Sequence, residues 1–180
     1  MFTNLDSVDV TTSNYIKAGI HTVKITKVES SKASNPTAKT PYIDFMMETT
    51  DGATGKARIF GDRPGQSPEA AEYKAKMLKR LLIAAGVTNF SDYISACKSA
   101  VGSTLKVAFA NREYWTNDKD GNPVIRTVAD YKWPVKDGEV FNPEWNKTMS
   151  QEDLRAYNDA LEATGTANAD KTAAVDDMPF

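Results

Sequence analysis

The chain has 180 residues, a formal net charge of −2 and a hydrophobic content of 41%. This length fits one domain with an appendage, and this composition excludes a wholly disordered chain. The single cysteine, Cys97, excludes an internal disulfide and suits a reducing cytoplasm. We find no secretory signal at the start, and no stretch near the roughly 18 apolar residues of a membrane-spanning helix. We therefore expect a cytoplasmic protein.

The charge is unevenly distributed along the chain. Residues 1–149 contain 20 Lys and Arg against 17 Asp and Glu, a net of +3, whereas residues 150–180 contain 2 against 7, a net of −5. A mildly basic body with an acidic end is compatible with a nucleic-acid partner, although solvated tails often show the same asymmetry.

Three strands are predicted in the first third of the chain. After an irregular lead-in, residues 1–17, His21, Val23 and Ile25 alternate with Thr22, Lys24 and Thr26, which is typical of a half-buried strand. A polar loop, residues 30–40, follows. The second strand carries Ile43, Phe45 and Met47 on one face and Tyr42, Asp44, Met46 and Glu48 on the other. After a turn at residues 50–52, the third strand points Ala57 and Ile59 inward and Lys56, Arg58 and Phe60 outward.

The period then changes to that of helices. Ser67 is a predicted cap with Pro68 at the first helical position, and apolar residues recur at three- and four-residue spacing until Gly86 ends the helix. The basic residues of this helix, Lys74, Lys76, Lys79 and Arg80, fit its solvent-exposed face. A second, shorter helix is predicted from a Ser91 cap through Ala100.

Two more strands and a polar helix follow. Leu105, Val107 and Phe109 alternate with Lys106, Ala108 and Ala110, Asp120-Gly121 predicts a turn, and the last strand runs from about residue 124 to 133. Ser150 caps a helix with a narrow apolar stripe, Leu154, Tyr157 and Leu161. Residues 165–175 show no pattern and predict a flexible tether.

This order of elements predicts a mainly β fold. Five strands with a helical insert between the third and fourth are the layout of the OB-fold, a Greek-key barrel. The expected organisation is an OB-fold domain at residues 1–149 that binds single-stranded DNA, a short helix at 150–164, and a disordered acidic tail at 165–180 that contains the tether and a partner-binding tip.

The end of the chain carries the most specific motif. Asp176-Asp177-Met178-Pro179-Phe180 resembles the C-terminal tip of bacterial single-stranded DNA-binding (SSB) proteins, with Met178 in place of the usual Ile. The resemblance implies that these residues bind partners of DNA replication, recombination and repair. Terminal and side-chain carboxylates suit a basic rim, and Phe180 can fill an apolar pocket. The segment 19–25 and the hairpin after it look more like SSB proteins of tailed phages.

Such a protein needs aromatic and basic residues on one face, because bases stack on rings while Lys and Arg follow the phosphates. The candidates lie on or beside the last four strands: Tyr42, Lys56, Arg58, Phe60, Lys106, Arg112, Tyr114, Trp115, Arg126, Tyr131, Lys132 and Trp133. For the aromatic candidates, the alternative to base stacking is a packing role within the fold. Tyr42 can be a half-buried packing residue, Phe60 can lie under the helical insert, and Tyr114, Trp115, Tyr131 and Trp133 can form one structural cluster.

No enzyme constellation, cofactor motif or metal site is predicted. His21 is the only histidine, and with Cys97 alone it cannot build a zinc site. The predicted function is sequence-independent binding of single-stranded DNA, with partners recruited through the tip. The alternatives are an interaction protein that mimics the tip to compete for SSB partners, and a single-strand annealing recombinase.

Overall fold

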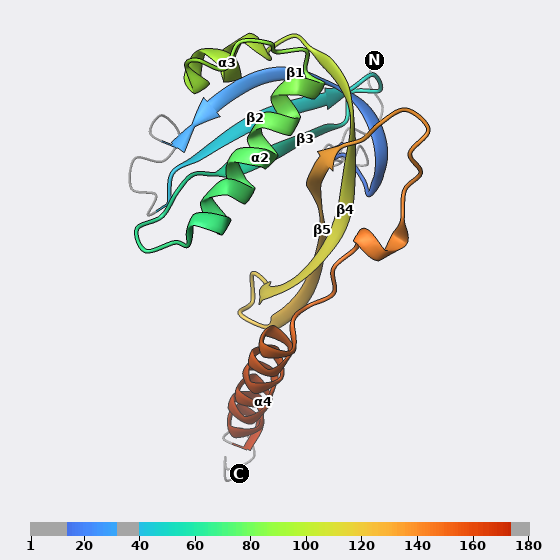
Figure 1. Ribbon diagram of the computed structural model, residues 1–180. Helices are drawn as coiled ribbons and strands as arrows, with labels where there is room; N and C mark the ends of the chain where they lie inside the picture. Colours follow the sequence, from blue (N-terminus) through green and yellow to red (C-terminus); the bar gives the residue numbers. More distant parts are fainter. Residues whose placement is uncertain (1–13, 32–39, 174–180) are drawn as a thin grey trace, which may run out of the picture. The chain divides into compact units, whose positions relative to one another are not determined.

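The computed structural model describes residues 14–31 and 40–173, the last eight by backbone alone, and is mainly β. Five strands form one antiparallel sheet in the order β3-β2-β1-β4-β5 (Figure 1). The strands are β1 Gly19–Ser30, β2 Tyr42–Thr49, β3 Thr54–Phe60, β4 Thr104–Asn117 and β5 Pro123–Pro134. The sheet is open, with β3 and β5 at its two edges.

The central strand β1 follows the predicted alternation. Val23 and Ile25 are buried, whereas the intervening Thr22, Lys24 and Thr26 are exposed. β1 pairs antiparallel with both β2 and β4, and its register to β2 shifts between Ile25 and Lys27. A one-residue bulge of this kind bends a strand and increases its twist.

The core lies against this sheet. Its largest fully buried side chains include Phe45, Met47, Leu81 and Phe109. The expected inward residues of β4 are buried, but Ala108 and Ala110 on the opposite face are 0% exposed as well. This part of β4 is therefore covered on both faces, and its small residues allow close packing there.

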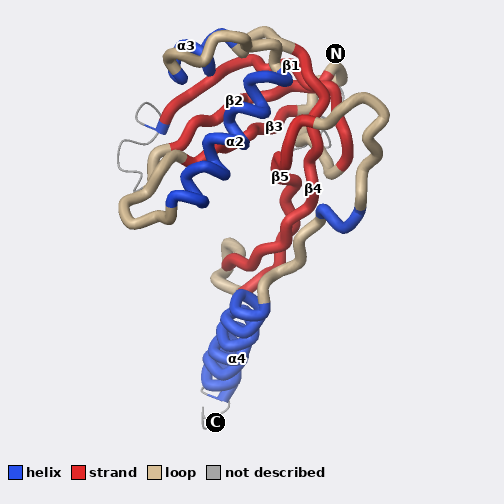
Figure 2. Tube along the Cα trace, in the orientation of Figure 1, coloured by secondary structure: helices blue, strands red, loops and turns tan. Residues whose placement is uncertain are grey.

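Two helices lie between β3 and β4 in the chain: α2 (Pro68–Ala84) runs alongside β3, and α3 (Tyr93–Ser99) lies against β1 (Figure 2). The predicted start of α2 is confirmed, because the Ser67 hydroxyl accepts a hydrogen bond from the Ala70 N–H at 3.3 Å. The predicted cap of α3 is wrong by one residue. Asp92 caps it and accepts hydrogen bonds from two backbone N–H groups of its first turn.

The chain divides into two compact units. The first ends at Ala110 and resumes from Asp130 to Asn142, and the second comprises Asn111–Ala129 and the chain from Pro143 onward. The second unit contains a short 3-10 helix, η2 (Pro143–Trp145), and the helix α4 (Gln151–Ala173).

The start of α4 has the predicted cap, in which the Ser150 hydroxyl accepts a hydrogen bond from the Asp153 N–H at 3.0 Å. The helix continues past the predicted end at residue 164 to Ala173, so the first part of the expected tether is helical. Within the described ranges, no helix is long and apolar enough to cross a membrane.

Candidate nucleic-acid interface

The outward face of the β2–β3 hairpin, in the first unit, brings four of the predicted residues together. The antiparallel register places Tyr42 opposite Phe60, Asp44 opposite Arg58 and Met46 opposite Lys56. Alternate residues of paired strands share a face, so Tyr42, Lys56, Arg58 and Phe60 form one cluster, which we call the hairpin face. The buried positions Ala57 and Ile59 point to the other side, as predicted.

Asp44 holds the guanidinium of Arg58 in a fixed plane. Arg58 Nε and Nη2 donate to the two carboxylate oxygens of Asp44, each at 2.7 Å. The Asp44 side chain is 7% exposed and that of Arg58 is 34% exposed. The hydrogen bonds to Asp44 raise the pKa of Arg58 above its already high usual value, so this group stays cationic at every relevant pH.

The rings of the hairpin face differ in their accessibility. The Arg58 guanidinium lies over the Tyr42 ring at 3.8 Å from its centroid, and Phe60 meets the same ring edge-on at 6.3 Å between centroids. Tyr42 is only 9% exposed, whereas Phe60 is 47% exposed. Tyr42 is therefore a packing residue that supports Arg58 and Phe60, and these two offer the accessible planar surfaces.

The hairpin face carries two cationic side chains, Lys56 and Arg58. Lys56 Nζ lies 3.7 Å from the nearer Asp44 oxygen, and the Lys56 side chain is 50% exposed. Lys56 and Arg58 thus share the carboxylate of Asp44, and these three side chains together carry one net positive charge. Together with the exposed ring of Phe60, this charge suits a polyanion that carries flat aromatic groups.

An open pocket adjoins the hairpin face. It has a volume of about 360 Å³ and is lined by residues of β3, α2 and β5, all in the first unit: Arg58, Ile59, Phe60, Ala70, Tyr73, Lys74, Met77, Tyr131 and Lys132. Phe60 and Arg58 therefore belong both to the hairpin face and to this pocket.

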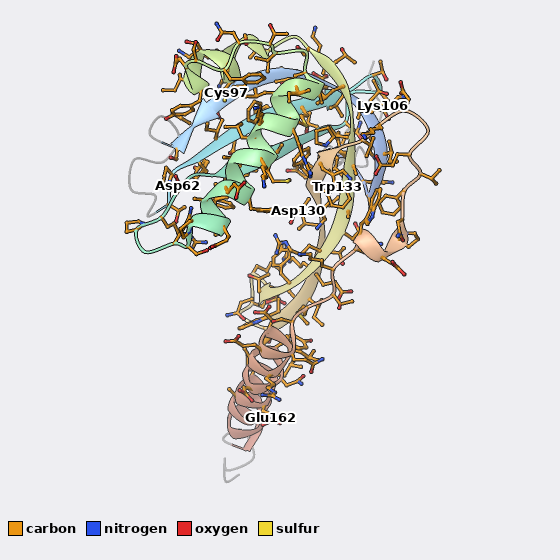
Figure 3. The ribbon with its side chains drawn as sticks, in the orientation of Figure 1. Asp62, Cys97, Lys106, Asp130, Trp133 and Glu162 are labelled. Atoms are coloured by element: carbon orange, nitrogen blue, oxygen red, sulfur yellow. The ribbon has the colours of Figure 1, made fainter. Side chains whose placement is uncertain are left out.

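The residues predicted at the end of β5 have different surroundings. The Tyr131 hydroxyl is buried without a hydrogen-bond partner among the described residues, and the Tyr131 ring meets Phe109 of the core edge-on at 6.2 Å. Burial strongly raises the pKa of Tyr131. Tyr131 therefore presents its ring to the pocket wall and no polar group to a ligand. Trp133, which is labelled in Figure 3, lies on the same strand. Both Trp133 and Lys132 are half-buried.

The ammonium group of Lys106 forms an exposed ion pair. Its Nζ donates to Asp137 at 2.6 Å within the first unit, and both side chains are largely exposed. An exposed ion pair of this kind contributes little to stability, so Lys106 can exchange its partner for a phosphate.

The other predicted residues, Arg112, Tyr114, Trp115 and Arg126, belong to the second unit. The Arg112 guanidinium lies 5.4 Å from the centroid of the Tyr114 ring, and Trp115 contacts Tyr157 of α4 with 6.4 Å between centroids. Trp115 is half-buried, whereas Arg126 is exposed. These four residues therefore belong to a different unit from the hairpin face. The predicted tip, Asp176 to Phe180, lies outside the described residues.

Two kinds of site residue are not among the sequence candidates. Asp44 orients Arg58. The sequence signal for this contact is the predicted hairpin, whose register places the two residues opposite each other. Tyr73, Lys74 and Met77 line the pocket from α2. The pattern assigns Lys74 to the solvent-exposed face, but Lys74 is half-buried and its Nζ donates to the Gly61 carbonyl oxygen at 2.8 Å. No sequence signal indicates this contact, which depends on how the chain after β3 folds back on α2.

The remaining chemistry-bearing residues have structural roles. His21 Nε2 donates to the Lys17 carbonyl oxygen at 2.9 Å, and its ring packs against Phe109. Cys97 is buried in α3. Among residues 14–31 and 40–173, no group of three or more His, Cys, Asp or Glu side chains is arranged to hold a metal ion.

Comparison with protein families and with curated sequences yields no match. No protein-family model matches the chain, and no curated protein matches its sequence. The fold and the hairpin face are therefore the features that indicate a function.

Proposed function

We propose that this protein binds single-stranded DNA without sequence preference. The observation that carries the proposal is the hairpin face, where an exposed ring, Phe60, shares one strand face with the oriented guanidinium of Arg58 and the exposed Lys56. Every base has a flat face that stacks on such groups, and every nucleotide has a phosphate, so this chemistry does not discriminate between sequences.

The strand order supports the same proposal. The order β3-β2-β1-β4-β5 is that of an OB-fold barrel opened between its third and fifth strands, and α2 and α3 occupy the insert position between β3 and β4. OB-folds bind oligonucleotides on the face of their second and third strands. The hairpin face lies on those two strands. We propose that the chain is an open OB-fold.

We further propose that the tip recruits proteins of DNA replication, recombination and repair in the cytoplasm of a cell, or of the host if the protein is from a phage. The support is the resemblance of Asp176 to Phe180 to the bacterial SSB tip, together with the net charge of −5 over residues 150–180. A polyanionic tip suits a basic docking site on a partner and is repelled by DNA, so the two activities belong to separate parts of the chain.

A fluorescence titration with a dT oligomer at two salt concentrations tests DNA binding. Bound phosphates release counterions, so the logarithm of the association constant should fall linearly with the logarithm of salt concentration, by about 0.7 per phosphate contact. Lys56→Ala should reduce this slope by about 0.7. Absence of binding by the intact protein at low salt would refute the proposal.

Phe60→Ala tests stacking. Loss of one base-stacking ring costs about 1–3 kcal/mol, so the affinity for dT should fall roughly 5- to 150-fold with the salt slope unchanged. Tyr93→Ala is the matched control, because Tyr93 is 58% exposed on α3 and lies outside the hairpin face. Equal effects of the two substitutions would argue against stacking on Phe60.

Deletion of residues 176–180 separates DNA binding from recruitment. The shortened chain should bind dT at least as tightly as the full chain and should lose binding to partner proteins. If the protein were instead a mimic of the SSB tip, the full chain would bind no DNA and the deletion would abolish its only activity.

A further inference from the structure

The pocket beside the hairpin face is lined by apolar groups and by three cationic side chains. Phe60, Tyr73, Met77 and Tyr131 contribute rings and a thioether, and the cations of its lining are Arg58, Lys74 and Lys132. No carboxylate is among its lining residues. Such a pocket favours a ligand with a flat apolar body and a negative charge.

Its walls are supported by contacts that preform them. Arg58 is fixed by Asp44 at 2.7 Å, and the Lys74 ammonium is fixed against the chain after β3 by the carbonyl oxygen of Gly61 at 2.8 Å. A ligand entering this pocket therefore spends little free energy on ordering these two side chains.

We propose that this pocket is a nucleobase subsite, in which one unstacked base of the bound strand inserts between β3 and α2. The inference rests on the proposed function, because it assigns a further contact to the same strand of DNA. Phe60 connects the two surfaces, since it belongs to both the hairpin face and the pocket lining. A strand that stacks on Phe60 reaches the pocket with its next base.

The size and lining of the pocket support a single base over a larger ligand. A volume of about 360 Å³ lies near the lower end of the roughly 300–1,000 Å³ typical of small-ligand sites. The exposed Tyr73 ring, 63% exposed, stands at the opening from α2 and can cover an inserted base. The cationic side chains among the lining residues, Arg58, Lys74 and Lys132, add a favourable potential for the flanking phosphates.

Filling the pocket tests the inference. Ala70 lines the pocket from the first turn of α2 and is exposed, so Ala70→Phe adds a ring to the pocket without disturbing the core. Ala75→Phe places the same ring at an exposed position of α2 outside the pocket and is the matched control. We expect Ala70→Phe to weaken binding of a dT 12-mer roughly 5- to 150-fold, and Ala75→Phe to leave it unchanged.

An abasic 12-mer with the same phosphates shows whether the lost contact is to a base. Ala70→Phe should leave its affinity, and the salt slope of dT binding, unchanged. If the substitution weakens abasic and dT binding equally, the ring blocks the backbone path and the inference is wrong. If it weakens neither, the pocket takes no part in DNA binding and the inference is also wrong.

The Met77 methyl group provides a direct readout. It lines the pocket, whereas Met47 is 1% exposed in the core and serves as an internal control. With methionine methyls isotopically labelled, and Met77 assigned through Met77→Leu, the dT 12-mer should shift the Met77 resonance upfield and the abasic 12-mer should not. Binding of dT without this shift rejects the subsite alone, whereas absence of dT binding by the intact protein rejects the proposed function itself.

Discussion

The ion pair between Asp44 and Arg58 should respond unequally to removal of its two partners. Arg58→Ala leaves a carboxylate that is 7% exposed without its bidentate donor. Loss of one partner of a fully buried pair costs about 3–5 kcal/mol. Lys56 at 3.7 Å still compensates part of the charge, and solvent reaches a third of Arg58, so we expect a loss of about 2–3 kcal/mol in the free energy of unfolding.

Asp44→Ala should cost less. It removes two hydrogen bonds to a charged group, worth about 1.5–3 kcal/mol in a buried site, but the released guanidinium can be hydrated. Because the Arg58 side chain is already 34% exposed, solvent screening reduces the expected loss to about 1–2 kcal/mol. The double substitution should cost less than the sum of the two, since the second removal has no pair left to break.

Urea unfolding followed by circular dichroism measures these differences, with Lys56→Ala as a control that should change stability by less than about 0.5 kcal/mol. A larger loss for Asp44→Ala than for Arg58→Ala, or strict additivity in the double variant, would refute this reasoning. The same two substitutions, Asp44→Ala and Arg58→Ala, should have opposite effects on the affinity for DNA. Asp44→Ala adds a unit of positive charge to the hairpin face, which at low salt should outweigh the lost orientation of Arg58 and tighten dT binding, whereas Arg58→Ala should weaken it.

Three further predictions concern stability and reactivity. In Gly55→Ala, the added Cβ would lie 3.0–3.1 Å from atoms of Ile16 and Phe109, so we expect about 1–3 kcal/mol of overpacking cost and a lower Tm; an unchanged Tm would contradict this. Burial raises the pKa of the Cys97 thiol to about 11, so a thiol reagent at pH 8 should label it only after unfolding, and immediate labelling of the native protein would be inconsistent with its burial. The Ser95 hydroxyl and the first-turn N–H groups of α3 lower the pKa of Asp92; this stabilisation is complete above the unfolded pKa of about 3.9 and is lost as the pH falls through the lower folded value. Asp92→Asn should therefore reduce the acid sensitivity of unfolding, and an identical pH profile for the variant would argue against the cap.

The local features of the fold follow from short-range patterns. The alternation in β1, the Ser67-Pro68 start of α2 and the Ser150 cap of α4 are predicted correctly, because each depends on residues within a few positions along the chain. The outward direction of Lys56, Arg58 and Phe60 is predicted for the same reason, since side chains alternate along a strand whatever its partners. The cap of α3 is missed because Asp92 follows directly after Ser91, and both residue types can fill that role.

The accessibility of the candidate rings depends on tertiary contacts and could not be predicted. Tyr42 and Phe60 lie on one face in the sequence pattern, yet Arg58 covers Tyr42 while Phe60 remains exposed. Tyr131 packs on Phe109, which is more than twenty positions earlier in the chain. Periodicity assigns a side chain to a face, but not to the neighbours that cover it there.

The sequence by itself therefore determines which residues can form strands, helices and a cationic, aromatic face, because these properties are local. It also contains the acidic tip, whose resemblance to the tip of bacterial SSB proteins is visible without a structure. Only the tertiary structure decides that β3 and β5 form the edges of an open sheet, that Asp44 orients Arg58, and that α2 forms one wall of a pocket beside Phe60. These arrangements join segments distant along the chain, and they form because burial of apolar surface and pairing of charges act between elements in space.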